Sequence, residues 1–127
     1  MADAVTSQTI FDGPTRTVMK FTNVSDGTGE SAVLKVDVSE LNGAPSRVRI
    51  MQVWFTCDGM SVDMFWDATS DVLAFSLPQT QNGHLDFRCF GGIPNNAGSG
   101  ITGDLMFTTV GHTSGDRYSI VLELAKN

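Results

Sequence analysis

The sequence contains few of the residues that carry charge or chemistry. It has two histidines, two cysteines and one tyrosine in 127 residues, and only 17% of its residues are charged, below the roughly 25% of an average globular protein. Its eight Lys and Arg form no cluster and its net charge is −6, so it lacks the basic patch with which proteins bind nucleic-acid phosphates. It also lacks the run of about 20 apolar residues that crosses a membrane. We expect neither nucleic acid nor a membrane as a partner.

The two cysteines, Cys57 and Cys89, are too few for the disulfide framework of a small secreted protein. The first residues do not combine a basic start with an apolar segment, the pattern of a secretory signal peptide. We interpret both cysteines as buried free thiols in a protein made in a reducing cytoplasm.

Patterns typical of cofactor and catalytic sites are also missing. The sequence has no Cys-x-x-Cys and no His-Glu-x-x-His, so zinc-ligand spacing is absent, and it has no Gly-x-Ser-x-Gly nucleophile turn. Residues 98–103 spell Gly-x-Gly-x-x-Gly, but a dinucleotide site requires a helix that begins within this motif, and residues 104–108 favour a strand. We therefore expect no cofactor, no bound metal and no enzymatic activity.

The sequence is rich in short alternating apolar runs, which are typical of half-buried β-strands. Residues 47–67 contain two β-prone runs joined at Asp58-Gly59, a pair suited to a two-residue hairpin turn. The first run is apolar at both parities, which predicts a central strand covered on both faces. Further strands are expected over residues 15–24, 31–41, 71–77, 84–90, 104–110 and 116–124, with one long loop over residues 91–103.

These signals predict an all-β fold, a single antiparallel β-sandwich of about eight strands within residues 15–127. Its expected core residues are Phe21, Leu34, Val36, Ile50, Trp54, Val62, Met64, Phe87, Ile120 and Leu122.

Two strand arrangements remain open. The pattern Phe-Thr-x-Val-x4-Gly followed by an acid occurs at residues 21–30 and again at residues 107–116, as expected if the first and last strands lie side by side. In a jelly roll the first strand pairs with the eighth, the second with the seventh, the third with the sixth and the fourth with the fifth. A tight turn at Asp58-Gly59 would instead pair the third and fourth strands directly.

Some apolar residues fall outside these patterns and are candidates for binding a partner. Residues 1–14 form an expected N-terminal arm, which would either add a strand to a neighbour's sheet or fold back on its own domain. Off-parity residues on the predicted strands would be either register errors or part of a patch that meets another subunit. The predicted partner-binding residues are Ile10 and Phe11 in the arm, Phe65 and Phe90 at off-parity positions, and Ile93, Pro94 and Ile101 in the long loop.

The stretches FTNVSDGTGESAVLKVDVSEL, VRIMQVWFTCDGMSVDMFWD and GHTSGDRYSIVLELAKN resemble small virion proteins of tailed bacteriophages, in particular the capsid cement or decoration proteins of cyanophage-type phages. The resemblance extends over residues 18–126 and contains no motif that carries chemistry. It implies a β-sandwich that forms a homodimer or homotrimer, binds the major capsid protein and stabilises the shell. The protein would be made in the host cytoplasm and reside in the virion.

A second class of function is open to the same fold, that of a carbohydrate-binding module or an adhesin-type tail or neck protein. Such proteins need exposed planar aromatic rings. Both tryptophans fall on the two central runs, and the single tyrosine, Tyr118, is in register with Ile120. This placement favours the cement protein over a sugar-binding protein.

Overall fold

The computed structural model describes residues 4–25, 33–41, 43, 45, 47–96, 98, 100, 102–111 and 113–126. This part of the chain contains nine strands and two short 3-10 helices. The strands are β1 (Ala4–Asp12), β2 (Arg16–Val24), β3 (Val33–Val36), β4 (Val48–Asp58), β5 (Ser61–Trp66), β6 (Val72–Leu77), β7 (Asn82–Asp86), β8 (Leu105–Val110) and β9 (Arg117–Lys126). The helices are η1 (Val38–Glu40) and η2 (Arg88–Phe90).

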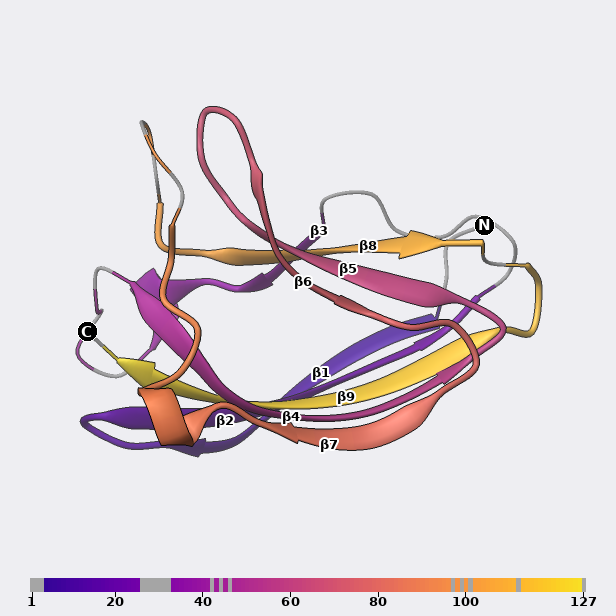
Figure 1. Ribbon diagram of the computed structural model, residues 1–127, viewed down its shortest axis with the longest axis horizontal. Helices are drawn as coiled ribbons and strands as arrows, with labels where there is room; N and C mark the ends of the chain where they lie inside the picture. The colour runs from indigo at the N-terminus through magenta and orange to yellow at the C-terminus, as the bar shows by residue number, and fades with distance from the viewer. Residues whose placement is uncertain are drawn as a thin grey trace.

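The strands form two antiparallel sheets that face each other (Figure 1). The large sheet has the order β1-β2-β9-β4-β7, and the small sheet has the order β3-β8-β5-β6. With β1 set aside, the pairs β2–β9, β3–β8, β4–β7 and β5–β6 are those of the predicted jelly roll. The prediction of an all-β antiparallel sandwich is confirmed, and the jelly-roll alternative is the correct one.

The alternative prediction, that the strands joined at Asp58-Gly59 pair as a hairpin, is therefore wrong. β4 and β5 belong to different sheets, and the turn carries the chain from one sheet to the other. Gly59 does have a positive φ of 81°, and a Cβ atom there would collide with the Asp116 carboxylate. The sequence signal correctly indicated a glycine-dependent turn, but such a turn does not require the strands it joins to pair with each other.

β4 is apolar at both parities because it contains a bulge. Its register with β9 shifts between Ile50 and Gln52, and an extra residue in one strand reverses which side chains face inward. Val48 and Ile50 are buried before the bulge, whereas Val53, Phe55 and Cys57 are buried after it. The strand thus contributes one apolar face to the core, and Trp54 points outward, contrary to the sequence prediction.

The core fills the space between the sheets. Aromatic residues lie at its centre: the Phe107 ring contacts the Phe21 and Tyr118 rings edge-on, at centroid distances of 5.3 and 5.9 Å. Of the predicted core residues, Phe21, Val36, Ile50, Val62, Met64, Ile120 and Leu122 are buried. Leu34 is exposed before a register shift in β3, and Phe87 is only partly buried, at the start of η2.

Two predicted strands end earlier than expected. Residues 31–41 were expected to form one strand, but β3 ends at Val36 and η1 follows, capped by the Asp37 carboxylate, which accepts a hydrogen bond from the Ser39 N–H. Residues 84–90 give only the end of β7 and then η2. The long loop that follows is held at its start, because Ile93 and Ile50 exchange two backbone hydrogen bonds.

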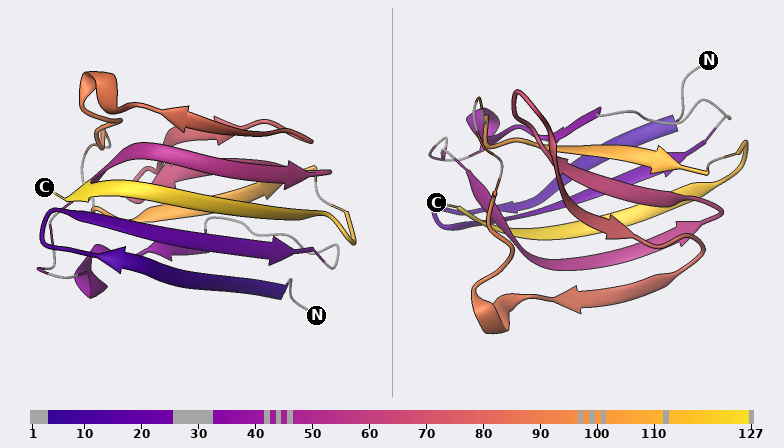
Figure 2. Two further views of the ribbon diagram at one scale, coloured as in Figure 1. Left: turned by 90° about the horizontal axis from the view of Figure 1, so that it is seen from below. Right: turned by 45° about the horizontal axis from the view of Figure 1, so that its top comes forward.

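The expected N-terminal arm is part of the sandwich over most of its length. β1 pairs with β2 along the edge of the large sheet, with a register shift between Thr9 and Phe11. Its end is tied to the other terminus by Lys126, which forms an ion pair with Asp12 and donates a hydrogen bond to the Gly13 carbonyl at 2.6 Å. The segment therefore lies on its own domain, the second of the two alternatives (Figure 2).

Both cysteines are free thiols, as expected, but only Cys57 is buried; Cys89 is exposed in η2. Over the described residues, no helix has the length and apolar character needed to span a membrane.

Candidate functional site

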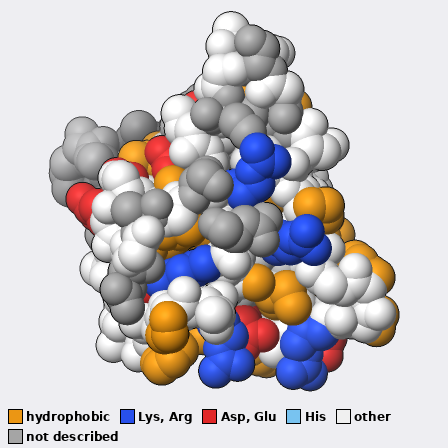
Figure 3. Space-filling model, turned by 90° about the vertical axis from the view of Figure 1, so that its left-hand side faces the viewer, with side chains coloured by type: hydrophobic (Ala, Val, Ile, Leu, Met, Phe, Trp, Pro, Cys, Tyr) orange, Lys and Arg blue, Asp and Glu red, His pale blue; other side chains and the backbone are white. Residues whose placement is uncertain are grey.

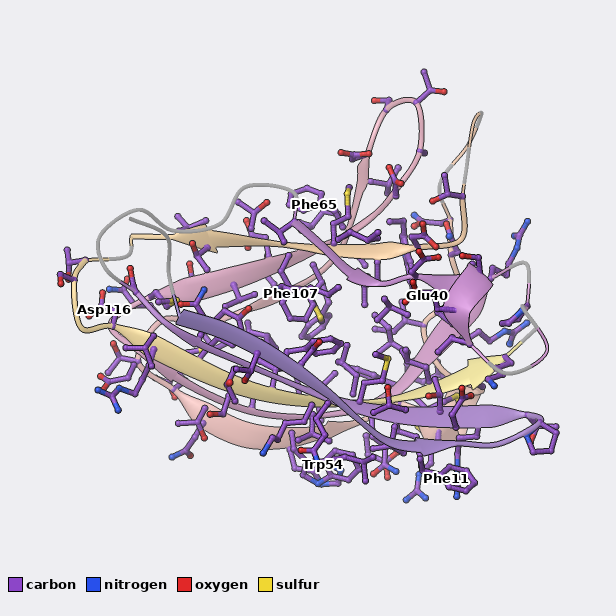
Figure 4. The ribbon with its side chains drawn as sticks, turned by 180° about the vertical axis from the view of Figure 1, so that it is seen from behind. Phe11, Glu40, Trp54, Phe65, Phe107 and Asp116 are labelled. Carbon is purple, nitrogen blue, oxygen red and sulfur yellow. The ribbon has the colours of Figure 1, made fainter. Side chains whose placement is uncertain are left out.

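An apolar row crosses the outer face of the small sheet. It consists of Leu34, Met106, Phe65 and Leu73, which are register partners from β3 through β8 and β5 to β6. Leu34 and Leu73 at its ends are 47% and 49% exposed, and Phe65 is half-buried. We call this set the apolar row. Figure 4 shows Phe65 on the outer side of the small sheet and Phe107 between the two sheets.

The off-parity position of Phe65 is therefore real and not a register error. Val62, Met64 and Trp66 of β5 point into the core, so Phe65 must point outward. Met106 is only 6% exposed although it lies on the outer face, between its register partners Leu34 and Phe65. A row of apolar side chains on the solvent face of a sheet is unusual in a protein that has no partner.

Basic residues gather at one end of the sandwich, where β1 and β9 end and β2 and β4 begin. We call this the basic end. Five of the chain's eight Lys and Arg lie at these strand ends or in η2: Arg16, Arg47, Arg49, Arg88 and Lys126. Figure 3 looks at this end and shows Lys and Arg side chains interspersed with hydrophobic ones.

Three of these cations have carboxylate partners. Lys126 is only 4% exposed and pairs with Asp12, whereas Arg16 lies 3.4 Å from Glu123 and Arg88 lies 2.8 Å from Asp86. Hydrogen bonds from Arg88 lower the pKa of Asp86 to about 2, and the same contact raises the pKa of Arg88.

Arg47 and Arg49 differ from the other three cations. Neither forms an ion pair with any carboxylate of the described residues. The Arg49 guanidinium makes only a long contact of 3.5 Å to the Gly91 carbonyl, and its buried Nε has no acceptor in the described structure. Two guanidinium groups at the basic end therefore retain donors for an acidic partner.

Several predicted partner-binding residues also lie at the basic end. Ile10 and Phe11 are exposed at the shifted register near the end of β1, and the Arg16 guanidinium lies over the Phe11 ring at 5.5 Å. Phe90 in η2 is 64% exposed and Pro94 is exposed, but Ile93 is half-buried against the core. Phe65 belongs to the other sheet, and Ile101 lies outside the described residues.

Trp54 is a candidate binding residue that sequence reasoning placed in the core. Its indole is 37% exposed on the outer face of the large sheet, where it stacks on the His84 ring with centroids 4.8 Å apart and planes inclined by 3°. Figure 4 shows Trp54 pointing away from the small sheet. Only the bulge in β4 places it there, and the sequence carries no clear signal for that bulge.

Groups that could support metal or thiol chemistry are scarce. Among the described residues, no three His, Cys, Asp or Glu side chains lie close enough to hold a metal ion. Burial raises the pKa of the Cys57 thiol to about 11, so Cys57 stays protonated and unreactive at neutral pH. The glycine motif at residues 98–103 leads into β8 and not into a helix, so the phosphate-binding context is missing.

The sequence matches no protein-family model, and comparison with curated proteins finds no relative. Among solved structures, a cupin-superfamily protein from Desulfitobacterium hafniense is 9% identical and has a TM-score of 0.37, over 99% of this chain and 80% of that one. A family 29 carbohydrate-binding module, crystallised with cellulohexaose, is 7% identical and has a TM-score of 0.41, over 97% of this chain and 78% of that one. Similarities this weak carry no argument about function, and the jelly-roll assignment rests on the strand order itself.

Proposed function

We propose that this chain is a non-enzymatic structural protein of a virion, a cement protein that binds the shell of a tailed-phage capsid. The proposal starts from the sequence resemblance, and the observation that carries it is the basic end. This end combines exposed Phe11 and Phe90 with Arg47 and Arg49, whose guanidinium groups pair with no described carboxylate. Aromatic and Arg side chains are the residues most enriched at the centres of protein interfaces.

The charge distribution favours an acidic partner surface. The whole chain has a net charge of −6, so an acidic shell would repel it at long range. At the basic end three cations are paired with carboxylates, so Arg47 and Arg49 are the cations that remain available to an acidic surface. Complementary charge mainly raises the association rate and fixes the orientation. We infer that the basic end contacts an acidic patch of the major capsid protein.

The apolar row supplies the second contact that a cement protein needs, a surface for association with its own copies. It lies on the small sheet, away from the Trp54 face of the large sheet. A homodimer or homotrimer formed through the apolar row would present several basic ends together, and linked binding sites raise the strength of attachment without any new contact. The protein would be made in the host cytoplasm and retained in the virion.

Capsid binding tests the proposal. Purified capsids of the phage that carries the gene, stripped of this protein, are mixed with wild-type chain or with the Arg47→Glu/Arg49→Glu variant, and bound protein is measured after sedimentation. We expect the variant to bind at least about tenfold more weakly, since two cation contacts to an acidic surface are lost. Wild-type binding should also weaken as salt is raised.

The matched control is Lys20→Glu/Arg117→Glu, which changes the net charge by the same amount on other parts of β2 and β9. It should bind nearly as well as wild type. Arg88→Glu, at an exposed position of the basic end, provides a second variant in case the double variant does not fold. If folded variants of the basic end decorate capsids as well as wild type does, the proposal is wrong.

A further inference from the structure

A shallow depression of about 490 Å³ lies on the outer face of the large sheet, over β4, β7 and β9. Trp54, His84 and Val121 form one register row across these strands, and Thr56, Asn82 and Ser119 form the next. A second depression continues from Thr56 and Asn82 toward Thr80 and Gln81. Together they trace an open path along β4 and β7, away from both the apolar row and the basic end.

The Trp54 ring is held in place by a chain of polar side chains. His84, on which it stacks, has its Nε2 2.7 Å from the Gln52 Oε1. The Gln52 Nε2 in turn donates a hydrogen bond of 2.8 Å to Glu123. Gln52 and Glu123 are only 5% and 8% exposed. Buried polar groups are costly unless they are paired, and here the pairing fixes the orientation of the exposed rings.

The same chain of hydrogen bonds determines the tautomer of His84. The Gln52 amide donates to the Glu123 carboxylate, so its oxygen must face the imidazole. His84 therefore carries its hydrogen on Nε2 when it is neutral, which leaves Nδ1 as an acceptor. His84 is exposed and can offer this acceptor to a ligand.

The lining of the depression indicates the class of ligand. Around Trp54 it contains no Lys, Arg, Asp or Glu, and the second depression adds only the carboxylate of Asp58, so the path has no counter-charge for a phosphate or another anion. The side chains of Thr56, Asn82 and Ser119 form no hydrogen bond with any described residue. An aromatic wall beside neutral hydroxyl and amide groups matches a sugar ring, whose C–H face packs on an aromatic ring while its hydroxyls exchange hydrogen bonds with the protein.

We propose that this face binds a neutral polysaccharide or glycan chain, with one sugar ring against Trp54 and its hydroxyls on Asn82, Thr56 and Ser119. The open shape of the depression suits a chain that lies across the sheet. His84, Gln52 and Glu123 act as positioning residues, because they hold the indole without needing to touch the sugar. This activity would add to the proposed cement function, since the face lies away from the basic end.

Affinity electrophoresis tests the proposal, with native gels that contain dextran, mannan, galactan or hydroxyethyl cellulose. We expect at least one of these polymers to retard the wild-type protein, and we expect Trp54→Ala to weaken binding at least about tenfold. Trp54→Tyr should restore part of the affinity, because it restores a planar ring. Gln52→Leu should weaken binding less than Trp54→Ala does. Binding should not change with salt, unlike attachment to capsids.

Phe90→Ala is the matched control, because it removes an exposed aromatic ring at the basic end and should leave retardation unchanged. Fluorescence adds a direct readout: the chain has two tryptophans, and Trp66 is fully buried, so a sugar-induced change in emission should disappear in Trp54→Ala. The proposal is overturned if none of the four polymers retards the folded wild-type protein, or if Trp54→Ala binds as well as wild type. It is also overturned if Trp54→Ala changes the oligomeric state, which would make this face a self-interface.

Discussion

At the scale of single residues, the two tryptophans illustrate how position decides the role of a side chain. Trp66 ends β5 and is fully buried, whereas Trp54 lies beyond the bulge of β4 and remains 37% exposed. Both lie in β-strands within the same stretch of sequence. Because the side-chain period of a strand is two, one inserted residue is enough to move Trp54 from the core to the surface.

The two tryptophans should therefore contribute very differently to stability. Trp66→Ala removes a fully buried aromatic ring and should lower the free energy of unfolding by about 3–5 kcal/mol. Trp54→Ala should cost about 1–2 kcal/mol, because part of its apolar area is already in contact with water. Urea denaturation followed by circular dichroism measures both. Equal losses would contradict the exposed position of Trp54.

At the scale of elements, β1 is held by more than its pairing with β2. The Thr17 hydroxyl donates a hydrogen bond to the Phe11 carbonyl at 2.9 Å, and Lys126 binds Asp12 and Gly13. Side chains of β2 and β9 therefore hold the end of this edge strand in addition to the backbone pairing. Its other edge is not paired with any described strand.

The ion pair between Asp12 and Lys126 should contribute measurably to stability. Asp12→Asn keeps the shape but removes the charge of one carboxylate that pairs with the nearly buried ammonium group of Lys126, so we expect a loss of about 2 kcal/mol. Asp86→Asn is the control, since it breaks an exposed pair with Arg88 and should cost clearly less than Asp12→Asn does. Thermal unfolding measures the stability of both variants. Similar losses would mean that the ion pair between Asp12 and Lys126 contributes no more to stability than the exposed pair does.

Most elements could be predicted from the sequence because alternation and turn residues report local structure directly. The sequence pattern shared by residues 21–30 and 107–116 also indicated that the first and last predicted strands, β2 and β9, are neighbours. The bulges in β3 and β4 could not be predicted, because they depend on pairing partners distant in sequence. Trp54 and Leu34 were misplaced for that reason. Phe65 was identified as an outward residue, since alternation alone determines its direction.

At the scale of the whole molecule, the apolar row, the basic end and the Trp54 face lie on different parts of one sandwich. The contacts proposed above, with another copy, with the shell and with a glycan, would therefore not compete for one surface.

Self-association should depend on the apolar row. Phe65→Asp places a charge at its centre and should shift the protein from oligomer to monomer, because a carboxylate loses its hydration when it is buried in an interface. Val110→Asp, on an exposed apolar position of β8 outside the row, should leave the oligomer intact. Sedimentation velocity over a range of concentrations measures the distribution. A wild-type protein that stays monomeric, or a Phe65→Asp variant that still assembles, would contradict this role.

The place of β9 in the large sheet has a consequence for how the protein is made. The ten-residue strand β9 comes last among the described strands but lies between β2 and β4, so neither half of this sheet is complete before β9 has been synthesised. Folding that depends on such distant pairings takes milliseconds to seconds. A chain that stops short of β9 would leave β2 and β4 with open edges. Only copies that contain β9 would then fold, so the order of the strands would itself select against chains truncated before this strand.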